Sequence, residues 1–229
     1  MRVWTRKCEP LRNPEVALTP PDTAGQALAE ETRECILDAA EKYFRHIGHH
    51  KTTVADIASA VGMSRGNIYR FFPSKDAIDS AICARLVNET VQMALEIALK
   101  NTAASERLVE ILYALHQHRK EMLMQARPMH ELLVSAMDES WAIMKTHAQK
   151  LVDIFEAVIL EGLETSELQP QDAAGSAQAM MAAFMPFFHP VLIEQCVRHD
   201  CNTEPALQAQ INFIMKALGR SDPAVHGSR

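Results

Sequence analysis

Apolar residues recur at helical spacing along most of the chain beyond residue 30, and no segment shows the alternation of a half-buried strand. The first stripe lies within residues 30–47 and consists of Ile36, Ala40, Tyr43, Phe44 and Ile47. Gly48 follows, at a position where glycine often ends a helix in the left-handed conformation. The pattern predicts a helix that ends just before Gly48.

Two shorter apolar stripes come next. Thr53 is followed three residues later by Asp56, an arrangement in which the hydroxyl and the carboxylate can each accept a backbone N–H at a helix start. Gly62 and Ser64 then supply a tight turn and a fresh helix cap. Two short helices joined by a three-residue turn that contains glycine are the pattern of a helix-turn-helix.

The rest of the chain predicts longer helices, with no internal repeat. Their expected ranges are 74–99, 104–119, 121–137, 139–165, 172–197 and 203–219. Only 8 Gly accompany abundant Ala, Leu, Met and Glu, which favours helix over sheet. We therefore predict an all-α protein, with an N-terminal three-helix helix-turn-helix domain and a larger C-terminal helical domain.

The domain organisation follows from where the pattern starts and stops. Residues 1–29 hold four prolines and no periodicity, which predicts a flexible arm or a stretch outside the working protein. We place the helix-turn-helix domain at 30–76 and the second helical domain at 77–219. Residues 220–229 are expected to be a flexible tail.

Charge and cysteine content limit the function classes. The formal net charge of −6 argues against a protein that coats nucleic acid indiscriminately, although it leaves room for a local basic face. Prolines stand where a signal peptide needs an apolar run, and the most apolar stretch, 179–193, is too short to span a bilayer. Five scattered cysteines without CxxC pairing indicate reduced thiols, so we expect a cytoplasmic protein with no membrane partner.

The helix-turn-helix region carries the local basic face. No acidic side chain occurs from Ile57 through Lys75. Arg65 and Asn67 stand at the start of the second helix, and their forked polar groups match guanine and adenine edges. Hydroxyls and a lysine nearby suit phosphates, namely Thr52, Thr53, Tyr69 and Lys75. Alternatively, Thr53 and Ser64 are only helix caps and Tyr69 only packs.

These residues also carry a family resemblance. The runs Ile36–Ala40, Thr52–Ala58, Val61–Phe72 and Ser74–Asp76 closely resemble the N-terminal domain of the tetracycline-repressor (TetR) family. The resemblance implies an all-helical homodimer whose C-terminal domain binds a ligand that moves the two DNA-binding heads apart. One departure is Arg70-Phe71, where a His-Phe pair is commoner in the family. The family's DNA contacts map onto Thr52, Thr53, Ser64, Arg65, Gly66, Asn67, Tyr69, Arg70 and Lys75.

The C-terminal two thirds predict two further sites with less specific signals. Adaptable thioethers and aromatic rings suggest an apolar effector pocket formed by Met122, Met129, Met137, Trp141, Met144 and Phe187, with plain core as the alternative. Apolar stripes suggest a dimer interface formed by Leu151, Phe155, Val158, Gly162, Met181 and Phe184, with the core of a single subunit as the alternative.

Taken together, the sequence predicts a regulator rather than an enzyme. It lacks a GxSxG, a P-loop, a dinucleotide fingerprint and an HExxH, so we expect no catalytic residue, metal or cofactor. His130, Glu131, His147 and His189 could form a metal site only if the fold brought them together. The expected partners are a palindromic DNA operator, a second copy of the chain and a small-molecule effector that releases the repressor. A constitutive architectural DNA binder is the alternative.

Overall fold

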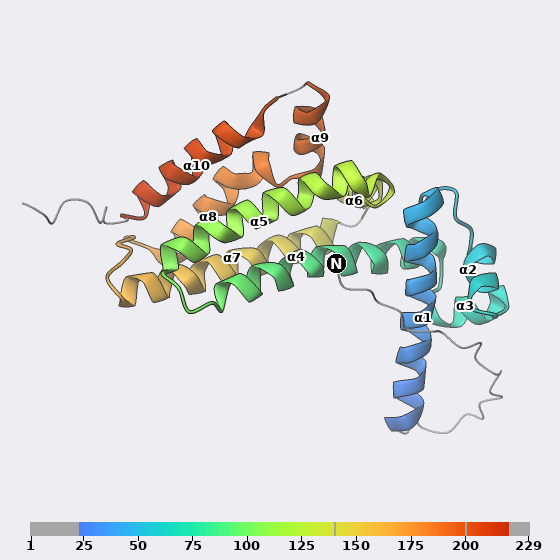
Figure 1. Cartoon of the computed structure of the whole chain (residues 1–229). Coiled ribbons are helices and arrows are strands. Elements are labelled where there is room, and N and C mark those ends of the chain that lie inside the picture. The colour runs from blue at the N-terminus through green and yellow to red at the C-terminus, as the bar shows by residue number, and fades with distance from the viewer. Residues whose placement is uncertain (1–22, 140, 200, 220–229) are drawn as a thin grey trace, which may run out of the picture. The chain divides into compact units, whose positions relative to one another are not determined.

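The computed structural model describes residues 23–139, 141–199 and 201–219, and within these ranges the regular structure is entirely helical, as predicted. The helices in chain order, shown in Figure 1, are α1 (Thr23–Ile47), α2 (Val54–Ala60), α3 (Arg65–Phe71), α4 (Lys75–Ala98), α5 (Ala104–Gln125), α6 (Arg127–Glu139), α7 (Trp141–Glu164), α8 (Ala173–Phe184), the 3-10 turn η1 (Met185–Phe187), α9 (Pro190–Arg198) and α10 (Thr203–Ala217).

The helices differ from the sequence pattern at three places. Helix α5 runs to Gln125 rather than to residue 119, so α6 begins at Arg127 rather than at 121. Helix α1 begins at Thr23, so the prediction of a flexible arm over 1–29 is wrong for residues 23–29; residues 25–31 are exposed, which is why this part of the helix carries no apolar stripe. The rest of the predicted arm, 1–22, and the predicted tail, 220–229, lie outside the described residues.

The helix expected over 172–197 is broken into α8, η1 and α9. Pro186 and Pro190 stand at the two breaks, because proline lacks the N–H that a continuous helix requires.

The chain divides into two compact units between Ala84 and Arg85, within α4. In the first unit, α1, α2 and α3 enclose a core of Ile36, Ala40, Phe44, Ile57, Ile68 and Phe72. The glycines that end α1 and α2 have positive φ, 86° at Gly48 and 67° at Gly62. Glycine suits both turns, since a side chain would strain that conformation.

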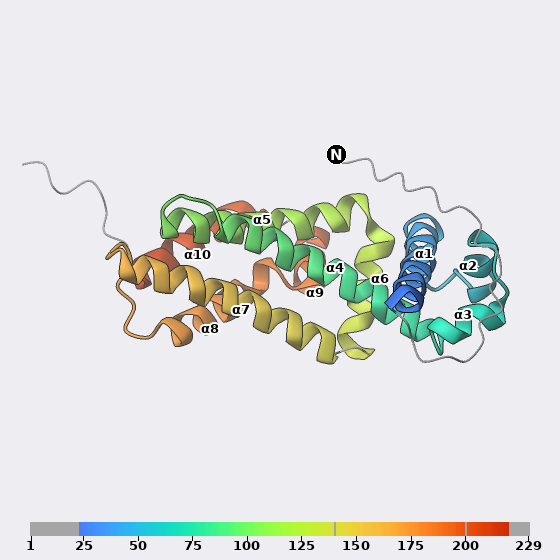
Figure 2. The same ribbon diagram turned by 90° about the horizontal axis from the view of Figure 1, so that it is seen from below.

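The second unit is a helical bundle around a larger core. Helices α7 and α8 pack along each other (Figure 2), and α5 also packs on α7. Gly162 of α7 allows a close approach, because a Cβ atom there would lie 2.6 Å from Leu168 Cδ1 and 3.0 Å from Ala104 Cβ. Glu167 caps α5 by accepting the backbone N–H groups of Ala104 at 2.8 Å and Ser105 at 2.9 Å.

Residues 173–198 are long and apolar enough to cross a bilayer by length and composition, and only 33% of the most apolar window is buried. In the structure this stretch is two helices separated by a 3-10 turn rather than one continuous helix. Part of the apolar surface of α8 therefore faces outward from the subunit.

Candidate functional site

Helix α2 begins with the capping arrangement that the sequence predicts. Thr53 N–H donates to Asp56 Oδ2 at 2.9 Å, and the N–H of Asp56 donates to Thr53 Oγ1 at 3.2 Å. The side-chain hydrogen bond from Thr53 Oγ1 and the backbone one hold the pKa of Asp56 below its ordinary value. The cap fixes the start of α2 and therefore the turn that leads into α3.

Helix α3 presents its polar side chains outward. Ser64 caps it by accepting the N–H of Asn67 at 3.2 Å, and Ile68 anchors it in the core with no exposed surface. On its outer side Arg65, Gly66, Tyr69 and Arg70 are exposed and Asn67 is half-buried. Five of the predicted DNA-binding residues thus lie together on one short helix, next to its Ser64 cap.

A residue that the sequence reasoning missed fixes the other end of α3. Arg33 of α1 donates from Nη1 to the carbonyl oxygen of Phe71 at 2.9 Å, and its guanidinium lies 4.1 Å from the centroid of the Phe72 ring. The hydrogen bond satisfies a carbonyl that the helix end would otherwise leave open. Only the fold brings Arg33 to this place, so no local motif marks it.

Two residues predicted to contact phosphates, Thr52 and Lys75, make contacts with other residues of the same chain. Thr52 is 1% exposed, and both its hydroxyl and its N–H donate to the carbonyl oxygen of Gly48, so it closes the end of α1. Lys75 Nζ lies 2.8 Å from Asp79 Oδ2 and 5.1 Å from the centroid of the Phe44 ring. Burial argues against a phosphate contact by Thr52, and a phosphate at Lys75 would compete with Asp79.

The residues predicted for the dimer interface lie inside one subunit. Phe155 and Phe184 have no exposed surface, and Leu151, Val158 and Met181 are buried with them in the same core. Gly162 is also buried, where it makes room for Leu168 and Ala104. The alternative therefore fits these side chains better: they form core within the chain, and their burial argues against a contact with a second copy.

The predicted effector residues are mostly interior. Met122, Met129, Met144 and Phe187 are buried and Met137 is half-buried, whereas the side chain of Trp141 lies outside the described part of the structure. An open pocket of about 290 Å³ lies elsewhere on the same unit, lined by Leu123, Met124, Arg127, Glu194, Val197 and Arg198. None of the residues predicted for the effector pocket lines it.

Polar side chains lie among these apolar ones. Arg119 of α5 is 1% exposed, with its guanidinium carbon 5.0 Å from the centroid of the Phe188 ring. The His147 ring stacks on the same phenyl ring at 5.9 Å. Burial, and then repulsion by Arg119 and Lys150, lower the pKa of His147 to about 3, so it is neutral at physiological pH.

Three further histidines have lowered pKa values. Burial is the main cause for His118, His130 and His189, and the positive charge of Arg119 contributes to each. These histidines come from α5, α6 and the residue before α9, and His147 comes from α7. From the sequence, His130, His147 and His189 were expected to meet only if the fold brought them together, but nothing in the sequence pointed to Arg119. Among the described residues no group of three potential ligands is placed to hold a metal ion.

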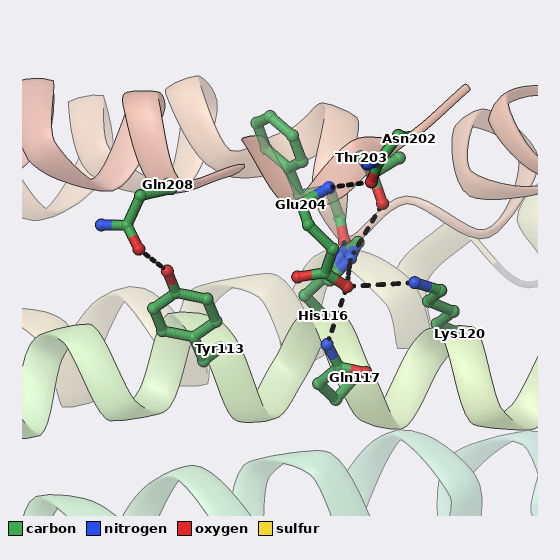
Figure 3. A network of polar contacts seen from close by, with 9 residues as sticks. Tyr113, His116, Gln117, Lys120, Asn202, Thr203, Glu204 and Gln208 are labelled. Atoms are coloured by element: carbon green, nitrogen blue, oxygen red, sulfur yellow. Dashed lines mark hydrogen bonds and ion pairs between the residues drawn. The ribbon is translucent and has the colours of Figure 1, made fainter. Parts of the chain in front are cut away.

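A second polar network ties α10 to α5 (Figure 3). Glu204 Oε1 accepts from Lys120 Nζ and from Gln117 Nε2, each at 3.0 Å, and the hydrogen bond from Lys120 is the main reason that the pKa of Glu204 is lowered. His116 is fully buried, with Nδ1 2.9 Å from the carbonyl oxygen of Phe187 and Nε2 3.2 Å from Thr203 Oγ1. Both of its ring nitrogens are therefore occupied.

Comparisons with known proteins agree with this geometry. The family described as "Bacterial regulatory proteins, tetR family" matches residues 36–82, and "Tetracyclin repressor-like, C-terminal domain" matches residues 104–207. The HTH-type transcriptional regulator YhgD of Bacillus subtilis is 24% identical over 181 residues, which cover 73% of this chain and 91% of YhgD. The regulator AcrR of Shigella flexneri is 31% identical over 103 residues, which cover 42% of this chain and 48% of AcrR.

Solved structures show the same fold. SmeT in complex with triclosan superposes with a TM-score of 0.59 at 19% identity, covering 84% of this chain and 93% of SmeT. FadR of Bacillus subtilis in complex with stearoyl-CoA superposes with a TM-score of 0.55 at 16% identity, covering 80% of this chain and 98% of FadR. The likeness extends over both units of the chain.

Proposed function

Since this chain belongs to the TetR family of transcriptional regulators, we propose that it is a repressor that binds a palindromic DNA operator as a homodimer and leaves it when a small-molecule effector binds the larger unit. Membership of this family makes the chain a helix-turn-helix transcriptional regulator. The operator, the direction of control and the effector response are the proposal.

The observation that carries the proposal is the outer side of α3. Arg65 and Asn67 stand in its first turn, next to the cap at Ser64, and are not buried. In helix-turn-helix proteins the N-terminal residues of the second helix contact base edges in the major groove. Arg65 can donate two hydrogen bonds to guanine and Asn67 can make a pair with adenine, which gives sequence readout.

Phosphate contacts would come from the residues around this reading position. Tyr69 is 49% exposed and Arg70 is exposed, and no ion pair is recorded for Arg70 within the described ranges. Thr53 is exposed beside the start of α2. Such contacts fix the register of a protein on DNA without reading sequence, and they weaken as salt rises.

We assign dimerisation to the outer faces of α7 and α8. Leu160 and Leu163 of α7 are 43% and 44% exposed, and Ala179 and Ala182 of α8 are exposed as well. These helices pack along each other, so their outer faces can meet the same pair of a second copy in a four-helix bundle. Contact between two copies would also cover the apolar surface of residues 173–198.

The effector response is assigned to the second unit. Two structures with the same fold were solved with a small molecule, triclosan in SmeT and stearoyl-CoA in FadR. The interior of this unit holds the deformable side chains Met122, Met129 and Met144, which can rearrange around a ligand. A protein with this role would act in the cytoplasm, where the chromosome of a bacterium lies, and would need no catalytic group.

Selection of bound duplexes from random and genomic DNA tests the proposal. The wild type should enrich a palindromic motif at fixed salt, and the variant with Arg65→Ala and Asn67→Ala should lose it while keeping weak general binding. Lys100→Ala, which removes one positive charge from the other unit, is the matched control and should enrich the same motif. An architectural DNA binder would instead bind all duplexes alike, and the proposal would then fail.

A further inference from the structure

The buried polar cluster of the second unit defines the chemistry of a ligand. It consists of Arg119, His130 and His147, which are 1%, 1% and 3% exposed, respectively. Burying such groups costs free energy unless they are hydrogen-bonded. Nδ1 of His130 and Nδ1 of His147 are both buried without a hydrogen-bond partner in the structure. They are therefore two unsatisfied polar atoms in the interior of the unit.

The hydrogen bonds of His147 fix which of its nitrogens carries the proton. Thr90 Oγ1 donates to the carbonyl oxygen of Val87 at 2.7 Å, so toward His147 it can only accept. His147 Nε2 lies 3.3 Å from that oxygen and must be the N–H donor. In the neutral ring Nδ1 is then a bare lone pair, which requires a hydrogen-bond donor or a proton.

His130 is oriented in the same manner. Its Nε2 lies 3.4 Å from Glu194 Oε2, and a carboxylate can only accept, so the ring proton is on Nε2. Burial raises the pKa of Glu194, but hydrogen bonds from Arg198 and His130 outweigh burial and keep that pKa below its ordinary value. His130 Nδ1 is therefore a second bare acceptor.

Open nitrogens also occur at His118 Nε2 and His189 Nδ1 of this unit, whereas His116 on α5 shows that a fully buried histidine here can have both of its nitrogens hydrogen-bonded. It is completely buried, yet the carbonyl oxygen of Phe187 and the hydroxyl of Thr203 occupy both of its nitrogens (Figure 3). In the cluster around Arg119, by contrast, the rings of His130 and His147 each keep one nitrogen, Nδ1, without a hydrogen-bond partner.

The surroundings of the cluster combine positive charge with aromatic surface. The charged groups that act on His147 are Arg119 of α5 and Lys150 of α7, and both are positive. Helix α4 contributes the neutral Thr90, and α6 contributes His130, on which Arg119 also acts. Phe188 lies against both Arg119 and His147, and Phe184 stacks on Phe188 at 6.2 Å.

We propose that the effector is an organic carboxylic acid with an apolar body, and that its carboxyl group binds between Arg119 and Nδ1 of His147. One carboxyl oxygen accepts from the guanidinium, and the other shares a proton with Nδ1. The apolar body packs on Phe188 and Phe184. The inference rests on the proposed function, since it names the ligand class to which the regulator responds.

The proton balance of binding follows from this arrangement. A carboxylic acid is ionised in neutral solution, and His147 is neutral in the free protein. When the carboxylate enters, one proton from the solvent joins it on His147 Nδ1, which gives a carboxylate between two positive groups. Binding of the acid should therefore take up about one proton per subunit, because the site starts with fewer protons than it ends with.

We place the entry of the ligand on the outer side of His130. Glu194, which accepts from His130, also lines the open pocket of about 290 Å³. Arg127 and Arg198 line the same pocket and attract an anion, with Nη2 of Arg198 2.7 Å from Glu194 Oε1. Rearrangement of the thioether of Met122, whose sulfur lies 3.8 Å from Arg119 Nη1, would open space beside the guanidinium.

Calorimetry with matched probes tests the inference on protein that has already selected its operator. We use octanoate with octanol, and phenylacetate with phenylethanol, in two buffers of different ionisation enthalpy at the same pH. At least one acid should bind about tenfold or more tightly than its alcohol, take up about one proton and weaken operator binding. Equal binding of acid and alcohol, or no binding of either acid, would overturn the inference while the proposed function stood.

Substitutions at Arg119 and His147 test which residue carries the preference for the acid and which carries the proton uptake. Arg119→Met should remove the preference for the acid, and His147→Gln, which can still donate to Thr90 Oγ1 but has no bare ring nitrogen, should abolish proton uptake. Lys120→Gln removes a positive charge one residue further along α5, where Lys120 contacts Glu204, and should change neither result. Circular dichroism checks folding, and if Arg119→Met does not fold, persistent proton uptake in His147→Gln alone would contradict the inference.

Discussion

The two units of the chain differ in where their candidate recognition groups lie: they are exposed in the first unit and buried in the second. In the first unit the residues proposed to contact DNA are exposed on α3, and the polar groups beneath them serve as helix caps, as Thr53 and Ser64 do. In the second unit Arg119 and His147 are buried against Phe188. A recognition surface for a large polyanion must be open, whereas selective binding of a small molecule requires enclosure.

The comparison also separates two kinds of sequence signal. The caps and the turn of the first unit are formed by residues three or four positions apart, so their pattern is legible in the sequence. The cluster of the second unit joins residues from α4 to α9, and each of its hydrogen bonds depends on the tertiary packing.

The largest expected effect concerns the face of α7 that lies in the core. Phe155→Ala should lower the free energy of unfolding by about 3–5 kcal/mol, because it removes a fully buried ring and leaves a cavity. Urea unfolding monitored by circular dichroism measures the change. Leu99→Ala, at a position that is 76% exposed, is the control and should cost less than about 1 kcal/mol. A small effect at Phe155 together with loss of dimers would place that residue at the interface instead.

The second expected effect is a pH dependence that belongs to the buried cluster. The folded pKa of His147 is about 3 against an ordinary value of 6.5, so the unfolded chain binds more protons between these values. Stability should therefore fall as pH decreases from 6.5, by up to about 3 kcal/mol at about pH 4 if this histidine acts alone. His118, His130 and His189 act in the same direction.

Thermal or urea unfolding across that pH range measures this dependence. His147→Gln should flatten the profile, because its side chain does not titrate. His46→Gln, on the exposed part of α1, is the control and should leave the slope unchanged. A variant His147→Gln with the full wild-type slope would show that the buried ring does not carry the effect.

The third expected effect concerns the outer face of α7. Leu160→Glu combined with Leu163→Glu should raise the dimer dissociation constant at least about 100-fold, which corresponds to about 2.7 kcal/mol. Burying two carboxylates in a four-helix bundle is unfavourable, while both positions tolerate charge in a single subunit because they are exposed. Sedimentation velocity measures the mass. Leu99→Glu is the matched control, and a double variant that remained dimeric would exclude this face.

The smallest expected effect tests the local signals of the first unit. Thr53→Ala should lower the free energy of unfolding by about 1 kcal/mol, since it removes the hydroxyl that caps α2. Ser59→Ala, at an exposed position of the same helix, should stay within about 0.5 kcal/mol of the wild type. Equal effects in both variants would mean that the cap does not order the helix.

The sequence predicted the fold class and most of the helix order, because helical periodicity and the Gly48 and Gly62 turns are local features. It also predicted that α7 and α8 form the dimer interface, but the residues that it named for that interface fill the core of the unit. Both faces of these helices are apolar, Phe155 inward and Leu163 outward, so periodicity could not separate the core from the outer face. Only packing against Leu168, Ala104 and the other helices decides between them.

The candidate site divides in the same manner. Arg65, Asn67 and Tyr69 could be placed from the motif, whereas burial of Thr52 and the pairing of Lys75 with Asp79 depend on neighbouring elements. Arg33 was missed because its contact with Phe71 joins residues 38 positions apart. His130 and His147 were named only as possible metal ligands, and Arg119 was missed, because residues on separate helices have no local spacing that shows whether they meet.

The central claim is that α3 reads DNA sequence. Its most direct test is to measure binding of the selected duplex and of a scrambled duplex at several salt concentrations, by fluorescence anisotropy, for the wild type and for Arg65→Ala combined with Asn67→Ala. The account predicts that the variant loses about 100-fold or more in discrimination between the duplexes, while the salt dependence on scrambled DNA is almost unchanged. A variant that discriminates as well as the wild type would contradict the account.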